Sequence, residues 1–320
     1  MAGSSPGLPA PPVIRRFRTV VPSEGRLGPQ PVWRVGTVLK TCLGLSRPER
    51  ARVWRCGGVT VNGRPVPAQH VHCYPGDVVE AWYPEPPSGV APEPDLPLRV
   101  LYEDEWLLAV DKPAGQLSHP ARSEQRGTIA NAVAARWGRH EPVRLVHRLD
   151  RDTSGVLLFA RDAATARSLA RQRAQGRLAR WYLALVAGRP PASGEIGLWL
   201  GPDPAHRTRQ LAFAQPGASG APARTSYRVI QYGPDATLIA AQLHTGRTHQ
   251  LRAHCAAIGH PLLGDALYGG PPWHGLDRQA LHAWRTVFQH PATGRRLAIT
   301  APLPDDFRAA ARSALGLRRS

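Results

Sequence analysis

The sequence predicts an α+β protein in which a small N-terminal α/β unit precedes a larger domain with a mixed β-sheet. Two observations predict this class. Residues 84–97 carry proline at six positions, which stiffens a segment and prevents regular strand pairing, so they are expected to be a linker. After residue 97, some strand patterns follow one another directly while helical patterns separate others, which indicates a mixed sheet.

The N-terminal part divides into a flexible start and a compact unit. Residues 1–29 are rich in Pro, Gly and Ser, and RRFRTVVP within them reads as a short edge strand. Residues 30–83 read as helices in VGTVLKTCLGL and SRPERARVWRC, a hairpin in VTVNGRPV and a closing strand in YPGDVVEAW. Ser46 and Glu49 form a capping box for the second helix. Asn62–Gly63 is the dipeptide of a tight hairpin turn.

The larger domain is expected over residues 98–305, with residues 306–320 as a C-terminal tail. It opens with one strand over residues 98–113. VLLFARD is an almost continuous apolar run, typical of a strand covered on both faces. RWYLALVAG alternates, with Trp181 and Tyr182 on opposite faces. Further strands are expected in TSYRVIQY and TLIAAQL, and helices in GTIANAVAARWG, DAATARSLARQRAQG and THQLRAHCAAIG.

The charge balance favours a polyanionic partner. The chain has 41 Lys and Arg against 23 Asp and Glu, a formal net charge of +18, and a pI near 11.1. Arg outnumbers Lys, which occurs only at Lys40 and Lys112, but such a bias does not explain the excess of base over acid. Neither a membrane-spanning apolar run nor a signal-peptide core is present. We therefore expect a cytoplasmic protein that binds nucleic acid rather than membrane.

The four cysteines indicate no metal site. They form no C-x-x-C pair, and no histidine stands at zinc-finger spacing from any of them. Reduced, packed thiols are the expectation in a cytoplasmic chain.

One carboxylate, Asp150, is the leading catalytic candidate. P-loop, G-x-G-x-x-G, H-E-x-x-H and G-x-S-x-G patterns are absent. In VHRLDRDTSG, Asp150 lies between Arg148 and Arg151 at the entry to the buried strand, a rigid mount for a site. The arginines would favour the ionised carboxylate, which suits a nucleophile or the stabilisation of a developing cation. A lone Asp is also commonly a cap or an ion-pair partner.

Two further segments carry candidate residues. In LHTGRTHQLRAH, Arg247 precedes a helix and could pair with Asp150 or with phosphate. His249 and His254 are five apart, a poor spacing for a metal pair. In DKPAGQLSHP, Lys112 follows a strand and precedes a turn that could lie over a cleft.

These motifs, taken together, resemble the RluA family of pseudouridine synthases. VHRLDRDTSGVLLFA resembles the family signature, DKPAGQLSHP its first motif and ARWYLALVAG its tyrosine-bearing strand. HTGRTHQLRAHCAAIGHPLLGDALYG and LHAWRTVFQHP resemble its C-terminal motifs. The resemblance implies a mixed, mostly antiparallel sheet with a central cleft and no cofactor. Residues 30–83 resemble the alpha-L RNA-binding motif domain, although Gly36 stands where an acidic residue is usual.

The resemblance also implies residue roles. Asp150 matches the essential aspartate, Tyr182 the active-site tyrosine that packs on the base and is a candidate for proton abstraction, and Arg247 the basic partner of the aspartate. Arg148 matches the arginine that helps to displace a flipped uridine. His147, Lys112 and Thr153 are assigned to substrate binding. Arg180 stands where the family usually has Lys, so the charge is kept.

The implied function is conversion of uridine to pseudouridine in structured RNA, with ribosomal RNA favoured over transfer RNA, by a monomer. Two alternatives stay open. A glycoside hydrolase would use Asp150 and Asp152, but it needs one protonated carboxyl, which the arginines oppose. A non-catalytic RNA-binding protein would not need Asp150, Tyr182 and Arg247 together.

Overall fold

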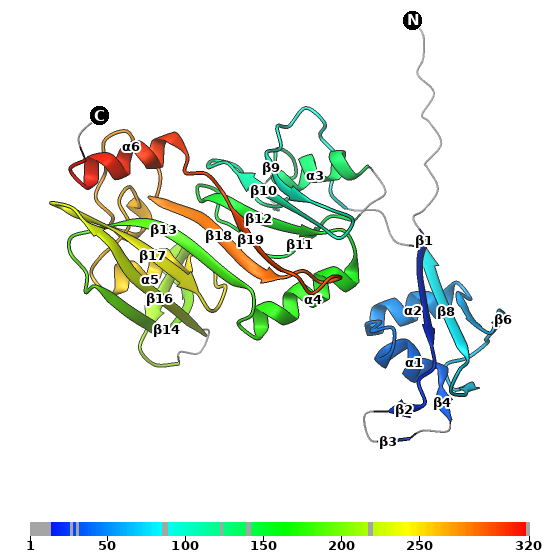
Figure 1. The fold of residues 1–320 in the computed structure, drawn as a ribbon. Coiled ribbons are helices and arrows are strands. Elements are labelled where there is room, and N and C mark those ends of the chain that lie inside the picture. Colours follow the sequence, from blue (N-terminus) through cyan, green and yellow to red (C-terminus); the bar gives the residue numbers. More distant parts are fainter. Residues whose placement is uncertain are drawn as a thin grey trace, which may run out of the picture. The chain divides into compact units, whose positions relative to one another are not determined.

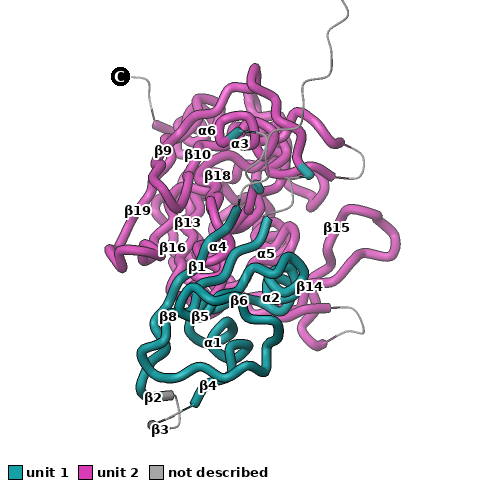
Figure 2. The backbone as a smooth tube through the Cα atoms, turned by 90° about the vertical axis from the view of Figure 1, so that its right-hand side faces the viewer, with its two compact units in different colours: residues 1–89, 138–142 teal, residues 90–137, 143–320 magenta. Residues whose placement is uncertain are grey.

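The chain folds as two compact units. The computed structural model describes residues 14–25, 28–29, 32–84, 89–121, 124–138, 142–216 and 220–317. One unit comprises residues 1–89 with 138–142, and the other residues 90–137 with 143–320 (Figure 2). The main division therefore falls within the proline-rich segment.

The first unit contains a four-stranded antiparallel sheet in the order β1-β8-β5-β6. Its strands are β1 (Ile14–Val20), β8 (Val78–Pro84), β5 (Val59–Val61) and β6 (Arg64–Pro65). Helices α1 (Val35–Thr41) and α2 (Arg47–Arg55) pack on one face of this sheet through Val38 and Val53. Two-stranded pairs join β2 (Glu24–Gly25) to β3 (Gly28–Pro29) and β4 (Trp33–Arg34) to β7 (His72–Cys73). The edge strand expected in RRFRTVVP is confirmed as β1.

Local sequence signals account for these elements. The Ser46 amide donates to Glu49 Oε2 at 2.8 Å, and the Glu49 amide donates back to Ser46 Oγ at 3.5 Å, which completes the predicted capping box. Asn62 and Gly63 have φ angles of 49° and 76°, the left-handed values that a tight hairpin turn requires. The predicted helices and hairpin of residues 30–83 are thus present.

The second unit is built on one large sheet, in the order β15-β14-β16-β17-β13-β18-β12-β10-β9, with β11 paired to β12 and β19 to β18 (Figure 1). Every pairing is antiparallel except that of β12 with β18. The predicted mixed, mostly antiparallel sheet is confirmed. The strands are β9 (Val100–Glu103), β10 (Leu107–Lys112), β11 (Arg144–Leu145), β12 (Ser154–Ala160), β13 (Ala179–Ala187), β14 (Ser193–Asp203), β15 (His206–Phe213), β16 (Ala221–Tyr232), β17 (Ala236–Leu243), β18 (Leu281–Gln289) and β19 (Arg296–Thr300).

Strand β12 is covered on both faces, as its apolar sequence predicts. On one face Leu157 and Phe159 share a cluster with helix α3 (Ile129–Trp137). On the other face Val156 and Leu158 share a cluster with Leu169 of helix α4 (Ala163–Ala174). The alternation of β13 is also confirmed, because Tyr182 belongs to the first of these clusters and Trp181 packs against a different one.

The remaining helices are α5 (Gln250–Ala257), the short 3-10 helix η1 (Ala266–Tyr268) and α6 (Asp305–Ala314). Within the part of the chain that the structure describes, no helix is long and apolar enough to cross a membrane.

The single strand expected over residues 98–113 is wrong: this stretch forms the antiparallel pair β9 and β10. Asp104 turns the chain between them. Its Oδ1 accepts the backbone amides of Trp106 and Leu107 at 2.8 and 2.9 Å. An acidic side chain that binds the backbone two and three residues on is a common turn device. Strands β14, β15, β18 and β19 were also not among the predicted elements.

Two segments assigned to irregular structure pack onto the second unit. Residues 306–320 were expected to be a tail, but α6 begins at Asp305 and buries Phe307, Ala310 and Ala314, one face of a helix. Much of residues 89–97 also packs there. Val90 lies in the main core cluster, and Glu93 Oε2 accepts the Gly127 amide at 2.8 Å. Within residues 84–97, only this later portion is shown to be part of the larger unit.

Candidate active site

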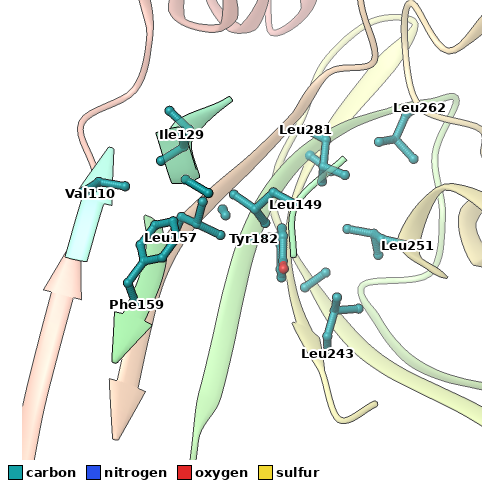
Figure 3. Close-up of a cluster of buried hydrophobic side chains, with 14 of the residues drawn as sticks. Val110, Ile129, Leu149, Leu157, Phe159, Tyr182, Leu243, Leu251, Leu262 and Leu281 are labelled. Atoms are coloured by element: carbon teal, nitrogen blue, oxygen red, sulfur yellow. The ribbon is translucent and has the colours of Figure 1, made fainter. Parts of the chain in front are cut away.

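A cavity of about 400 Å³ opens in the second unit between the loop that precedes β12, strand β13 and the start of α5. Part of its wall is the main apolar cluster: Figure 3 shows Tyr182 beside Leu149, Leu243 and Leu251. The polar and charged lining residues are His147, Arg148, Asp150, Thr153, Arg173, Arg180, Tyr182, Arg247, Thr248, His249, Gln250 and Arg252. Asp150 is the one carboxylate among the lining residues, and five of them are arginines.

Asp150 projects from a loop that neighbouring segments hold on three sides. Ser118 Oγ donates to the Leu149 carbonyl at 2.8 Å and accepts the Leu149 amide at 3.1 Å. Lys112 Nζ donates to the Arg151 carbonyl at 2.6 Å, and Arg278 Nη1 to the Asp152 carbonyl at 3.0 Å. Because backbone groups on both sides of Asp150 are fixed, its half-buried carboxylate has a defined position at the cavity.

The cation nearest to Asp150 is Arg252, not Arg247. Arg252 Nη1 lies 3.8 Å from Asp150 Oδ2, while its Nε and Nη2 donate to Asp265 at 2.7 and 2.6 Å. Arg252 also lies over the ring of Tyr268, 5.2 Å from its centroid. Arg247 is exposed at the edge of the cavity and donates through Nε to the Pro222 carbonyl at 3.2 Å. The expected pairing of Arg247 with Asp150 is therefore not found.

Arg252 was missed because the sequence interpretation followed the arginine before the helix. Both arginines lie in LHTGRTHQLRAH, but Arg252 stands inside α5 between buried Leu251 and Ala253. Because neighbouring residues of a helix lie about 100° apart around its axis, Leu251 and Ala253 do not indicate whether the side chain of Arg252 is buried.

Lys112 does not reach the cavity. It is fully buried, and its ammonium donates to the carbonyls of Pro113, Gln116 and Arg151 at 2.7, 2.6 and 2.6 Å. These three bonds use every N–H of the group. Burial lowers the pKa of Lys112 to about 7. Its expected role in substrate binding is replaced by a structural one, the attachment of the residue 112–116 turn to the Asp150 loop.

Thr153 lines the cavity but is buried, and its Oγ1 accepts a hydrogen bond from Gln279 Nε2 at 3.3 Å. The neighbours His147 and Arg148 both line the cavity but differ in exposure. Arg148 is exposed, whereas His147 is 4% exposed and neither of its ring nitrogens has a hydrogen-bond partner of acceptable geometry. Burial, reinforced by Arg180 and Arg173, lowers the pKa of His147 to about 3, so its ring is neutral.

Tyr182 is buried in the wall of the cavity, and this burial raises the pKa of its hydroxyl. The phenol is consequently protonated near neutral pH. A ring face in an apolar wall suits stacking on a planar base. The protonated hydroxyl makes Tyr182 a poor candidate for proton abstraction in this state.

His249 is a second residue that was not selected. It adopts a left-handed backbone conformation, with φ 53° and ψ 21°, immediately before α5. Its Nδ1 lies 3.2 Å from the Tyr268 hydroxyl oxygen, which also accepts the Gln210 amide at 2.9 Å. Non-glycine residues in this conformation are uncommon and cluster at functional sites.

The cavity thus presents one carboxylate to a substrate that arginines attract. Such a combination defines an enzyme site for a polyanion, and the aromatic ring in its wall suits a nucleobase.

Comparison with known proteins agrees with this class. Residues 106–257 match the family described as RNA pseudouridylate synthase. The chain is 43% identical over 225 residues to ribosomal large subunit pseudouridine synthase D of Nitrosomonas europaea, covering 67% of this chain and 64% of that protein. It is 42% identical over 272 residues to an uncharacterised RNA pseudouridine synthase of Chloroflexus aurantiacus, covering 82% and 84% respectively.

A solved structure has a similar fold. Human RNA pseudouridylate synthase domain containing 1 has a TM-score of 0.53 and 27% identity, over 67% of this chain and 86% of that one. The chain belongs to the RNA pseudouridylate synthase family, the family that its motifs resemble. It is therefore an isomerase of uridine in RNA.

Proposed function

We propose that this protein converts specific uridines of large-subunit ribosomal RNA to pseudouridine, with Asp150 as the catalytic carboxylate. The observation that carries the proposal is the position of Asp150. It is the sole acidic side chain among the residues that line the cavity, and Arg252 lies 3.8 Å from it. A guanidinium at this distance attracts the carboxylate and orients it.

The reaction breaks the bond between C1′ of the ribose and N1 of uracil, turns the base and joins C1′ to C5. The proton on C5 then leaves, and N1 gains one. An ionised Asp150 can attack C1′ or act while a glycal forms, and both routes are compatible with its position. Tyr182 supplies an apolar ring face against which the detached base is held.

The target base must leave its stack before Asp150 can reach C1′. Arg148 is exposed, lines the same cavity and lies two residues before Asp150. We assign to it the filling of the gap that the displaced uridine leaves. The remaining arginines of the cavity attract the RNA backbone.

Ribosomal RNA is the proposed substrate because the named relative from Nitrosomonas europaea is a ribosomal large subunit enzyme. Transfer RNA is the alternative target. A map of pseudouridine across total RNA, in a strain that lacks the gene, identifies the uridine and separates the two.

We also propose that residues 30–83 form an RNA-binding module of the alpha-L type. Two short helices with exposed Lys40, Arg47 and Arg55, packed on a small sheet, support this assignment. In the same proposal the enzyme acts as a cytoplasmic monomer. Four free cysteines agree with a reducing compartment.

The test of the main proposal is tritium release from RNA labelled at C5 of uridine. Asp150→Asn is expected to lower the rate at least about a thousandfold, the order of loss when a catalytic nucleophile is removed. Asp152→Asn is the matched control, since its side chain does not line the cavity. Equal rates for wild type and Asp150→Asn would exclude Asp150 from the mechanism. Release of free uracil that keeps its tritium, with a requirement for both aspartates, would favour the two-carboxylate chemistry of a glycoside hydrolase.

A further inference from the structure

The cavity has a second charged region, formed by Arg173, Arg180 and His147, whose arginines make no ion pair with Asp150; we call it the cationic end. Arg173 belongs to the last turn of α4, Arg180 to the start of β13, and His147 to the loop before β12. The three side chains influence one another electrostatically. Arg180 and Arg173 both oppose protonation of His147, and Arg180 opposes the charge on Arg173.

No acidic group balances this charge. Among the residues that the structure describes, no carboxylate lies within ion-pair distance of Arg173 or Arg180. Arg173 Nη1 donates to the Val146 carbonyl at 2.8 Å, and Arg180 Nη2 to the Thr245 carbonyl at 2.6 Å. These neutral acceptors hold the guanidinium groups in place but leave their charges uncompensated.

Hydrogen-bonding capacity is also unused at the same place. Arg180 Nε is buried without a partner, neither ring nitrogen of His147 has a hydrogen bond of good geometry, and both residues are only 4% exposed. Buried polar groups in folded proteins are nearly always satisfied, so several unsatisfied ones at one end of a cavity call for an explanation. Two like charges held close together without an acid are most simply explained by an anion that binds between them.

The position relative to Tyr182 identifies the anion. Arg180 and Tyr182 are two apart on β13, so their side chains lie on the same face, roughly 6–7 Å apart along the strand. A base held against Tyr182 carries its ribose and flanking phosphates within this range. We propose that the cationic end is a subsite for the backbone phosphate that flanks the displaced uridine. This inference rests on the proposed function, because it takes RNA as the substrate.

The subsite also positions the ribose for the reaction. A phosphate held at the cationic end fixes the ribose between that point and Tyr182, so C1′ is presented to Asp150 in one register. Arg173 and Arg180 are therefore binding and positioning residues, and Asp150 alone performs the covalent step. Glycine at position 246 permits this arrangement, since a Cβ there would lie 3.2 Å from Nη1 and Nη2 of Arg180.

The test combines protein variants with neutralised RNA. The RNA is a stem-loop built around the uridine that the mapping identifies, with a methylphosphonate replacing one phosphate at a time. For wild type, one of the two linkages that flank the uridine is expected to lose about tenfold to a hundredfold in affinity, the range for a charged hydrogen bond. For Arg180→Gln, the unmodified RNA is expected to bind more weakly by a similar factor. The same methylphosphonate should then reduce the affinity of this variant by less than about threefold.

Matched variants separate the subsite from general effects. Arg180→Lys keeps the charge without the planar guanidinium and is expected to lose less affinity than Arg180→Gln. Arg171→Gln removes an exposed arginine from the same turn of α4 as Arg173, outside the cavity, and is expected to keep the dependence on the flanking phosphate. Thermal melting identifies any variant that fails to fold, and the methylphosphonate effect on wild type needs no variant.

The outcomes also separate this inference from the proposed function. Equal methylphosphonate effects on wild type and Arg180→Gln, or none at either flanking linkage, would overturn the subsite even if the enzyme is active. Conversely, a flanking-phosphate effect that depends on Arg180, with no tritium release by wild type, would support the subsite and overturn the proposed catalysis.

Discussion

The two ends of the active-site cavity contain the same type of side chain in opposite electrostatic surroundings. At one end Arg252 donates two hydrogen bonds to Asp265 and lies 3.8 Å from Asp150, so two carboxylates accompany one guanidinium. At the cationic end Arg173 and Arg180 donate to the carbonyls of Val146 and Thr245. One arginine is fully compensated, and the other two are not.

This difference indicates the role of each buried arginine. Removing a guanidinium from water is unfavourable, and a protein offsets that cost with an acid when the arginine has a structural or positioning role. Arg252 follows this rule and orients Asp150. Where the acid is missing, as beside Arg180, the compensating charge comes from the ligand, so the free enzyme is held ready for an anion.

The largest effect on stability is expected from removing the acidic partner of Arg252, at the end of the cavity that contains Asp150. Asp265→Asn leaves Arg252 without its bidentate acceptor in a buried site. We expect the free energy of unfolding to fall by about 3–5 kcal/mol, the cost of breaking a buried ion pair by removing one partner. Urea unfolding measures this change.

Asp305→Asn provides the matched control, because Asp305 is 92% exposed in its ion pair with Arg308. Its loss is expected to cost no more than about 1 kcal/mol. Equal losses for the two variants would mean that Asp265 contributes no more than a surface charge.

A smaller effect is expected at the cationic end and depends on pH. The pKa of His147 is about 3 in the folded protein, below its ordinary value of about 6.5. Between these pH values the unfolded chain binds a proton that the folded protein does not. The stability associated with His147 is therefore fully present above about pH 6.5 and is lost as pH falls, by at most about 1.4 kcal/mol per pH unit.

His147→Phe keeps a ring and removes the titration. We expect urea unfolding between pH 4.5 and 6.5 to show a smaller dependence of stability on pH in this variant. The difference in slope corresponds to up to about one proton taken up on unfolding. Identical slopes for variant and wild type would show that His147 has the same pKa in both states of the chain.

The smallest effect is expected from Arg247, which the sequence pointed to and the structure places at the exposed edge. Arg247→Gln is expected to change RNA affinity less than about tenfold and to reduce the slope of log affinity against log salt by about one. Tritium release at saturating RNA should be unchanged, whereas Arg252→Gln should slow it strongly. A loss of turnover in Arg247→Gln equal to that in Arg252→Gln would restore the original pairing.

Local signals in the sequence were sufficient for several individual elements. The Ser46–Glu49 capping box, the Asn62–Gly63 turn and the two faces of β13 each depend on residues that are neighbours in the chain. Signals that depend on distant partners were misread. Residues 306–320 were taken for a tail because nothing local shows that Phe307 has a core to enter.

The same limit applies to the site. Asp150 and Tyr182 were found from their motifs, and the structure brings both to one cavity. Lys112 was assigned to substrate binding because its motif resembles that of the family and its turn could lie over a cleft, but carbonyls from two separate loops surround it. Arg252 is held beside Asp150 by its hydrogen bonds to Asp265. No local pattern in the sequence connects Asp265 to Asp150.

Arg278 makes the active site depend on a segment of the chain that is synthesised much later than Asp150. Its guanidinium donates to the Asp152 carbonyl at 3.0 Å and is held by Asp306 of α6 at 2.6 and 3.0 Å. The ribosome makes Asp150 long before residue 278 and completes the clamp only with residue 306. Domains fold as their segments emerge, so the Asp150 loop can acquire its final position only after residue 306 has been made. An enzyme proposed to modify ribosomal RNA would thus stay incompetent while the ribosome makes the more than 150 residues that separate Asp150 from Asp306.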